Sequence, residues 1–374
     1  MKITEQYLPY FLFMLLMLGG ASPAIGASPY PPSPIIKDIS WDFKNLVRLA
    51  PGSDLWPVTW AADGNLYTSW GDGGGFGGNN TDGRVSMGIA RIEGPSDGFT
   101  TVNINGGKNP LHPATWGCSA CGKAVGMLSV DGVLYAWLNT QNGSDPDFRL
   151  AWSNDMGATW SQANWAYRGS DFGEITFLNF GKDYANARDG YVYSYAVKRP
   201  FPRTTIELAR VPKQQITDRN AYEFFAGLDV SGNPKWTSDI TARKPVFEDT
   251  SGIGIASVSY NAGIGRYLLT TAHALDATYG LDNLGIFDSP TPWGPWTTAA
   301  YYETWGNFPS RWLAYYIPTK TPNWMSQDGT TIHLLFSGVG ELDSFNLVKG
   351  TITLRSSQLP GLPATPSGVN AVKK

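Results

Sequence analysis

Three carboxylic acids, Asp54, Asp72 and Glu174, stand where predicted β-strands begin or end, so their side chains could meet around one substrate. Two such groups can cleave a glycosidic bond. A protonated carboxyl supplies the proton to the leaving oxygen, and an ionised one assists at the anomeric carbon. The alternative is structural, with Asp54 capping a turn and Glu174 solvated. The strands that carry these residues decide between the two interpretations.

Five tight turns mark those strands, each beside a run of alternating aromatic and aliphatic residues. The turns are Asp63-Gly64, Asp131-Gly132, Asp189-Gly190, the turn that ends at Gly265, and Asp328-Gly329. An Asp-Gly pair between apolar runs is the strongest short-range hairpin signal, because two-residue hairpin turns need positive φ angles. The spacing of roughly 60 to 75 residues suits one generous propeller blade. The pattern predicts an all-β fold, a five-bladed β-propeller over residues 40–355.

The first strand of each hairpin determines which polar residues share one face. We place these strands at residues 56–62, 125–130, 175–180, 255–260 and 312–317. In an antiparallel hairpin, the start of the first strand and the end of the second lie at the same edge. Polar residues at that edge should converge on one mouth of the central channel, where propellers usually carry a site. They are Asp54, Asp72, Lys123, Asn139, Asp171, Glu174, Lys198, Arg199, His273, Ser310, Arg311 and Glu341.

Aromatic residues are abundant, with 15 Trp and 18 Tyr. Flat rings can cover the apolar faces of sugars, although most of these rings should pack between strands. A polysaccharide or oligosaccharide is therefore the predicted partner. The candidate substrate-binding residues are Trp56, Lys123, Asp171, Tyr260, His273 and Arg311.

The chain ends indicate export. Residues 1–26 combine a short apolar run with small residues before a cleavage point near Ala27, which predicts a signal peptide and a secreted protein. Residues 27–39 read as a Pro-rich spacer and residues 356–374 as a disordered tail. No other segment could span a membrane. The net charge of −3 and the lack of a long basic run argue against nucleic acid as a partner.

Residues 153–160 fit the pattern S-x-D-x-G-x-T-W at every fixed position. This resembles the Asp-box repeat of sialidases and other sugar-processing propellers, in which the motif has a structural role. The resemblance implies that Asp155 and Thr159 close a turn between the third and fourth strands of a blade. That turn should lie on the face away from the channel mouth.

The segment Asp54-Leu55-Trp56-Pro57, followed by residues 66–72, resembles the first blade of a bacterial family catalogued as domain of unknown function 4185. Some members of that family are glycoside hydrolases that act on D-arabinan. Residues 287–296 resemble an outer-strand turn of arabinanase-like five-bladed propellers. The resemblance covers most of residues 40–355 in architecture. In this sequence a glycine run follows Asp72, in place of the usual threonine.

In five-bladed glycosidases, a carboxylate on the first blade acts as base or nucleophile and one on a later blade acts as acid. The resemblance therefore implies that Asp54 is the base or nucleophile and Glu174 the acid. Asp72 would raise the pKa of Asp54 or orient it. The function expected is that of a secreted glycoside hydrolase acting on a polysaccharide.

Two other functions fit the same residues. A polysaccharide lyase would use His273 or Tyr260 for proton transfer, with Arg311 and Lys123 neutralising a uronate carboxylate. A non-catalytic glycan-binding propeller would need only the aromatic and amide side chains.

Cys118 and Cys121 are the only cysteines, and in an exported chain we expect them to form a local disulfide. The glycines at 73, 75 and 78 match G-x-G-x-x-G, but no helix follows to form a phosphate site. No cofactor and no metal ligand set is predicted. A structural calcium in the channel remains open.

Overall fold

The computed structural model describes residues 28–114, 122–140, 145–199, 203–273, 283–306, 308 and 314–356. The predicted signal peptide, the two cysteines, Arg311 and residues 357–374 of the predicted tail lie outside this part of the chain.

The regular secondary structure of the described chain is almost entirely β-strand, which confirms the predicted all-β class. The strands are β1 (Ile36–Trp41), β2 (Val47–Leu49), β3 (Asp54–Trp60), β4 (Leu66–Gly71), β5 (Met87–Glu93), β6 (Thr100–Asn105), β7 (Lys123–Val130), β8 (Val133–Asn139), β9 (Asp147–Ser153), β10 (Ser161–Gln162), β11 (Tyr167–Arg168), β12 (Ile175–Asn179), β13 (Tyr191–Val197), β14 (Thr205–Pro212), β15 (Glu223–Leu228), β16 (Pro234–Thr237), β17 (Pro245–Glu248), β18 (Ser257–Asn261), β19 (Arg266–Thr271), β20 (Leu284–Ser289), β21 (Thr297–Tyr302), β22 (Ala314–Tyr316), β23 (Thr331–Ser337) and β24 (Phe345–Leu354).

Helical structure is limited to single turns. They are α1 (Gly169–Phe172) and the 3-10 turns η1 (Phe43–Asn45), η2 (Lys182–Tyr184), η3 (Lys213–Gln215), η4 (Arg219–Ala221), η5 (Ile240–Ala242) and η6 (Gly340–Leu342). Within the residues that the structure describes, no helix is long and apolar enough to cross a membrane.

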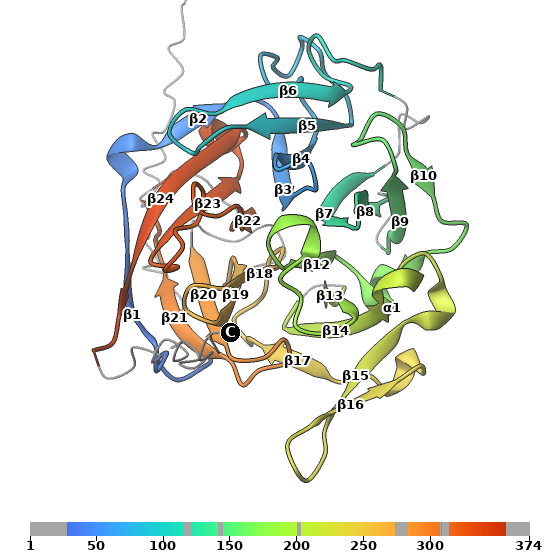
Figure 1. Ribbon diagram of the computed structural model, residues 1–374, viewed down its shortest axis with the longest axis vertical. Helices are drawn as coiled ribbons and strands as arrows, with labels where there is room; N and C mark the ends of the chain where they lie inside the picture. Colours follow the sequence, from blue (N-terminus) through green and yellow to red (C-terminus); the bar gives the residue numbers. More distant parts are fainter. Residues whose placement is uncertain are drawn as a thin grey trace, which may run out of the picture.

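The strands form curled antiparallel sheets arranged around a common centre, with β3, β7, β12, β18 and β22 innermost (Figure 1). One sheet runs β3-β4-β5-β6 and another β7-β8-β9-β10. A third joins two groups of strands through a parallel pairing of β12 with β18, where Leu178 lies opposite Val258. This is a β-propeller arrangement, and the count of five blades stays a prediction.

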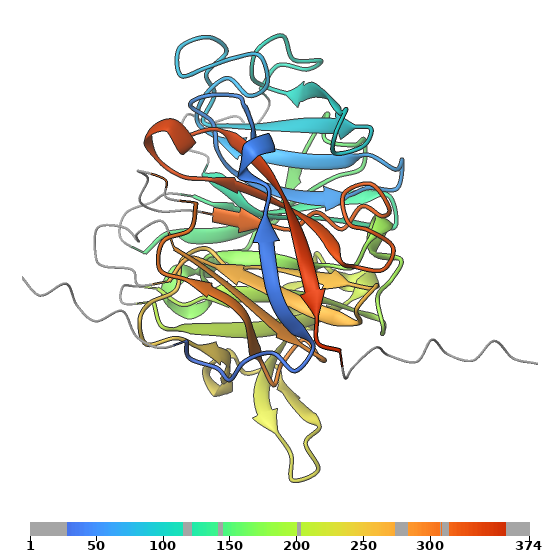
Figure 2. The same cartoon turned by 90° about the vertical axis from the view of Figure 1, so that its left-hand side faces the viewer.

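The last sheet is completed by the start of the chain. Strand β1 pairs antiparallel with β24, and Trp41 lies opposite Gly350. Figure 2 shows the two strands running side by side. Residues more than 300 positions apart in sequence therefore hold one sheet together, which closes the ring without a covalent link.

The turns follow the hairpin signals in part. Asp131 and Gly132 have φ angles of 50° and 81°, as a two-residue turn between β7 and β8 requires. In the turn after β9, Asp155 accepts hydrogen bonds from the backbone N–H of Thr159 at 2.8 Å and from its hydroxyl at 2.6 Å. The assignment of this turn as an Asp-box repeat stays a prediction.

Aromatic side chains fill the interior between the sheets. Trp56, Trp70 and Trp137 are fully buried, and the first two stack with ring centroids 5.7 Å apart. Burying a large apolar side chain stabilises the fold by roughly 1.5–3 kcal/mol. The abundance of Trp and Tyr thus serves mainly the packing of the sheets.

Candidate functional site

A cavity of about 370 Å³ lies where the innermost strands begin. Strands β3 and β7 start at Asp54 and Lys123, strand β8 ends at Asn139, and Glu174 directly precedes β12. All four residues line the cavity, as predicted from strand direction. The complete lining is Asp54, Leu55, Lys123, Val125, Asn139, Glu174, Arg199, Arg203, Ile255 and Val339.

Asp54, in one wall of the cavity, shares a single ammonium group with Asp72, which is not among the lining residues. The Nζ atom of Lys123 lies 2.9 Å from Oδ2 of Asp54 and 2.8 Å from Oδ2 of Asp72. Arg84 contacts the other oxygen of Asp72, with Nη2 3.1 Å from Oδ1. The side chain of Asp54 is 19% exposed and that of Asp72 is 40% exposed. The two carboxylates are therefore neighbours, and Asp72 stays open to solvent.

The environment of Asp54 favours its protonated form. Burial raises the pKa of its carboxyl to about 6, against an ordinary value of 3.8, although Lys123 acts in the opposite direction. The negative charges of Asp72 and Asp343 raise this pKa further. A carboxyl with a pKa near neutrality can give and take a proton during catalysis.

Gly71 makes the arrangement of Lys123 and Asp54 sterically feasible. This glycine ends β4 and lies opposite Asp54 in the strand pairing. A Cβ atom at this position would lie 2.6 Å from Oδ1 of Asp54 and would overlap the side chain of Lys123. The lysine can therefore cross the glycine and reach both aspartates.

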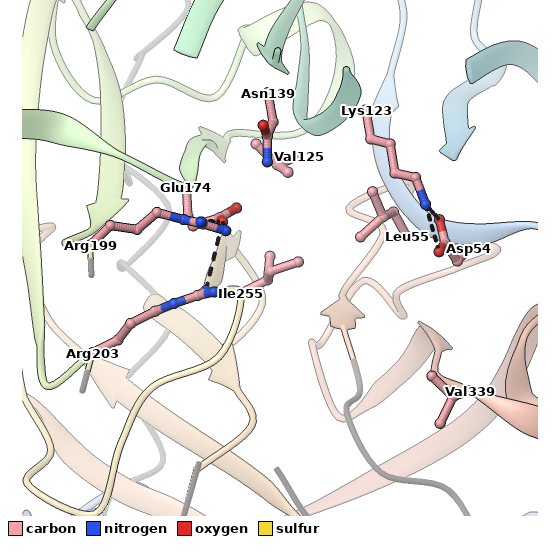
Figure 3. Close-up of a pocket in the computed structure, with 10 residues that line it drawn as sticks. All are labelled: Asp54, Leu55, Lys123, Val125, Asn139, Glu174, Arg199, Arg203, Ile255 and Val339. Carbon is pink, nitrogen blue, oxygen red and sulfur yellow. Dashed lines mark hydrogen bonds and ion pairs between the residues drawn. The ribbon is translucent and has the colours of Figure 1, made fainter. Parts of the chain in front are cut away.

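The opposite wall carries Glu174 between two arginines. Figure 3 shows this group facing Asp54 and Lys123 across the cavity. The Oε1 atom of Glu174 accepts from Nε of Arg199 at 2.8 Å and also contacts the Nη2 group of that residue. Arg203 lies 3.8 Å from the same oxygen. Glu174 is thus fixed in place by two guanidinium groups.

The backbone at the cavity adopts unfavourable conformations. Leu55, Trp56, Asp72 and Glu174 have φ angles of 77°, 70°, 56° and 44°. Non-glycine residues in this region cost of order 1–3 kcal/mol each, and such strain clusters at functional sites. Part of the cost is offset by a hydrogen bond of 2.8 Å that the backbone N–H of Leu55 donates to Oγ of Ser337. The strained backbone supports the interpretation that both walls belong to a functional site.

Trp56 does not face the cavity, contrary to its predicted substrate contact. Its side chain is fully buried, and its Nε1 donates to the carbonyl of Ser53 at 2.9 Å. The register of β3 against β4 shifts between Leu55 and Val58. This irregularity, with its positive φ angles, breaks the alternation of side chains and is accompanied by burial of the indole in the core. The buried indole leaves no surface for the predicted sugar contact of Trp56.

Tyr260 and His273 also lie apart from the cavity lining. Tyr260 is near the end of β18, where it packs against Phe180 and Tyr267 with centroids 5.3 and 4.9 Å away. It therefore lies towards the turn after β18. His273 is buried, stacked on Tyr301 at 3.7 Å, and its Nε2 is 2.9 Å from the carbonyl oxygen of Tyr302.

These placements bear on the lyase alternative. Neither Tyr260 nor His273 reaches the cavity, and Arg311 lies outside the described residues. Burial lowers the pKa of His273 to about 4. The described geometry therefore does not favour lyase chemistry. Asp171 is an exposed residue of α1 and is not among the lining residues.

The cavity includes residues that sequence reasoning missed. Arg203, Ile255 and Val339 line it, and Arg203 doubles the positive charge beside Glu174. Arg203 lies only four residues after Arg199, in the same return segment of the third hairpin, and that proximity was the available signal. The sequence left a structural calcium in the channel open. Among the described residues, no group of three or more His, Cys, Asp or Glu could hold a metal ion.

Comparison with solved structures shows the same fold at low identity. A structure described as RS223-Beta-xylosidase matches with a TM-score of 0.50 and 13% identity, over 83% of this chain and 95% of that one. A GH43_1 enzyme from Xanthomonas citri matches with a TM-score of 0.49 and 14% identity, over 83% and 93% of the two chains. A putative glycoside hydrolase from Bacteroides ovatus has a TM-score of 0.46 and 12% identity, over 86% and 93%.

No curated protein sequence matches this chain. A protein-family profile does match, over residues 126–341, and its description is domain of unknown function (DUF4185). The matched segment includes Glu174, Arg199 and Arg203, and it begins after Asp54, Asp72 and Lys123. Because the match covers more than half of the chain, this protein belongs to the DUF4185 family.

Proposed function

We propose that this protein is a secreted glycoside hydrolase that cleaves a polysaccharide in the cavity between the Asp54 and Glu174 walls. The observation that carries the proposal is the state of Asp54. It is a largely buried carboxyl with a pKa of about 6, it lines an open cavity, and a second carboxylate shares its ammonium partner. Such a pair provides one proton-exchanging group and one ionised group.

Asp54 is the residue that exchanges the proton. Its raised pKa lets it protonate the oxygen of the leaving sugar and then activate a water molecule. The resemblance to five-bladed glycosidases implied the role of base or nucleophile for Asp54. The raised pKa favours the acid and base steps over the nucleophilic step.

Asp72 is the partner carboxylate. Its ion pairs with Arg84 and Lys123 hold it beside Asp54, and its side chain is exposed next to the residues that line the cavity. Two carboxyl groups of a retaining enzyme lie about 5–5.5 Å apart, which suits residues that contact one ammonium group. The pair therefore supports cleavage through a covalent intermediate, with retention of the anomeric configuration.

Glu174 remains at the site in a different role from the predicted acid. Two guanidinium groups, of Arg199 and Arg203, lie beside its carboxylate, whereas a single ammonium group contacts Asp54. We assign it to substrate binding, with Arg199 and Arg203 held at the surface of the cavity as hydrogen-bond donors for sugar hydroxyls.

The comparisons support a polymer of pentoses as the substrate. The structure with a TM-score of 0.50 is that of a β-xylosidase. The first-blade residues that include Asp54 and Asp72 resemble those of the DUF4185 family, some members of which act on D-arabinan. Pentose polysaccharides of the arabinan and xylan type are therefore the first substrates to test.

The proposal is tested by incubating the purified protein with arabinans, xylans and uronate polymers. Reducing ends and the ultraviolet absorbance of unsaturated uronates are followed together. A hydrolase releases reducing ends without absorbance. Absorbance that rises with the reducing ends would show a lyase, and no release from any polymer would leave glycan binding as the function.

A further inference from the structure

A second cavity, of about 210 Å³, lies at the strand ends opposite to those that carry Asp54 and Glu174. Strand β12 begins directly after Glu174, and the chain reaches this cavity only after that strand has ended, at Arg188 and Asp189. The turn between β20 and β21, residues 290–293, supplies another wall. No described residue lines both cavities, so the second is a separate feature of the surface.

The walls of the second cavity are largely aromatic. Phe180, Tyr193 and Tyr267 are buried, and Trp293 is partly exposed. A partly exposed indole presents a flat apolar face, which can pack against the C–H face of a sugar ring. The volume is below the roughly 300–1,000 Å³ of pockets that enclose drug-sized ligands. The cavity therefore suits one sugar unit of a chain that continues over the surface.

Arg188 and Asp189 add polar groups to the aromatic walls, and both residues are exposed. The carboxylate of Asp189 is held in place, because Oδ2 accepts from the hydroxyl of Tyr193 at 2.6 Å and Oδ1 from the backbone N–H of Tyr191 at 3.0 Å. The guanidinium of Arg188 lies 6.0 Å from the ring centre of Tyr260 and forms no ion pair with any described residue. A guanidinium donates hydrogen bonds, and each carboxylate oxygen can accept a second one. The two side chains can therefore bind sugar hydroxyls of either polarity.

The turn that carries Trp293 is fixed by the folded protein. The hydroxyl of Tyr195 donates to the carbonyl of Pro292 at 2.8 Å. The ring of Trp293 also packs edge to face against Trp236, with centroids 6.2 Å apart. A surface that is already ordered avoids the entropy cost of ordering it on binding.

We infer that the second cavity is a binding site for pentose oligosaccharides, separate from the site of cleavage. Trp293 packs against a sugar ring, and Arg188 and Asp189 form hydrogen bonds with its hydroxyls. A polymer held here stays attached to the protein without occupying the Asp54 cavity. The choice of pentose chains rests on the proposed function, whereas binding at this site requires no cleavage.

An NMR titration reads the second cavity directly. The isotopically labelled protein carries Asp54→Asn, which prevents cleavage under the proposed function, and is titrated with arabino- and xylo-oligosaccharides. The indole N–H signal of Trp293 is assigned by its absence in Trp293→Phe. This signal should shift as at least one of the two oligosaccharides is added. The signal of Trp60, a half-buried tryptophan outside the cavity, should stay in place.

Arg188→Met tests the polar contacts without disturbing the core, because Arg188 is exposed. The dissociation constant read from the Trp293 signal should rise about three- to ten-fold, with an unchanged melting temperature. Lys182→Met is the matched control. It removes an exposed cation from the same loop, outside the cavity, and should leave the dissociation constant unchanged.

Two results would overturn the inference. One is a Trp293 signal that stays in place with both oligosaccharides. The other is a dissociation constant that is the same for Arg188→Met and Lys182→Met. Either result leaves the cleavage proposal standing, since that proposal depends on the Asp54 cavity. A shifted Trp293 signal in a protein that cleaves no polymer would support binding here and refute the hydrolase.

Discussion

The ammonium group of Lys123 contacts both carboxylate oxygens of Asp54, with distances of 2.9 Å to Oδ2 and 3.1 Å to Oδ1. A cation this close ordinarily lowers the pKa of a carboxyl. Here burial has the larger effect, and the pKa of Asp54 is raised to about 6. Burial therefore raises the pKa of the group that we assign to proton transfer, and Lys123 limits that rise.

Replacing Lys123 by Met should move the pH dependence of cleavage. Without the cation the pKa of Asp54 should rise, so kcat/KM should stay high to a more alkaline pH than in the wild type. Stability should fall by about 1–3 kcal/mol, because the remaining carboxylates lose their shared partner. Lys108→Met, which removes a more exposed ion pair with Asp82, is the matched control and should change neither property much. An unchanged pH profile for Lys123→Met would refute the coupling.

A single methyl group at position 71 should disturb the site. In Gly71→Ala the Cβ would overlap Lys123 and crowd Oδ1 of Asp54, so kcat/KM should fall at least ten-fold. Gly190→Ala is the control, because a Cβ atom at position 190 would have no other atom within 4 Å. Equal kinetics for the two variants would show that the crossing of Lys123 over Gly71 is unimportant.

The stability of the fold should depend on pH through Asp54. Because its pKa in the folded chain is above the ordinary value of 3.8, the folded state binds this proton more tightly. The contribution to stability is fully present below pH 4 and is lost as the pH rises through 6. It amounts to about 1–3 kcal/mol, since one pKa unit corresponds to about 1.4 kcal/mol.

Urea unfolding of the wild type and of Asp54→Asn at pH 4 and pH 7 measures this contribution. The free energy of unfolding of the wild type, relative to the variant, should be larger at pH 4. Other titrating groups cancel in that difference. A difference that does not vary with pH would contradict the raised pKa.

His273 should make the fold sensitive to acid. Burial lowers its pKa to about 4, so the unfolded chain binds a proton more tightly than the folded chain. The stabilisation that comes from the lowered pKa of His273 is fully present above pH 6.5 and is lost as the pH falls towards 4. His273→Phe keeps a ring on Tyr301 but loses the contact with Tyr302, so it should be about 1 kcal/mol less stable at pH 7. Between pH 6.5 and pH 4, the free energy of unfolding of this variant should fall less than that of the wild type. An equal fall would refute this role of His273.

The anomeric configuration of the first product tests the choice of Asp72 as partner. A pair on one ammonium group predicts retention, whereas Asp54 with Glu174 across the cavity would suit inversion if their carboxyls are farther apart. Proton NMR during early cleavage distinguishes the two. An inverted product would return the second catalytic role to Glu174.

Strand direction was the part of the site that could be predicted from sequence. Asp54, Lys123, Asn139 and Glu174 gather because each stands at the same edge of its hairpin, and the turn positions show this edge. Tyr260 was a candidate site residue although it ends the expected strand 255–260, away from that edge, and the structure places it near the end of β18. The fold class could be predicted from the spacing of the turns alone.

Local backbone irregularity could not be predicted. The orientation of Trp56 depends on two consecutive positive φ angles, and neither Leu55 nor Trp56 favours that region. The raised pKa of Asp54 depends on burial by residues from several sheets, which no motif near position 54 records.

The most direct measurement is the kcat of Asp54→Asn on the cleaved polysaccharide, beside that of Asp171→Asn. Asp171 is an exposed aspartate outside the cavity lining, so its variant carries the same chemical change without touching the site. The account predicts that Asp54→Asn loses about 10²- to 10⁴-fold in kcat, whereas Asp171→Asn stays within about two-fold of the wild type. Equal rates for the two variants would contradict the assignment of proton transfer to Asp54.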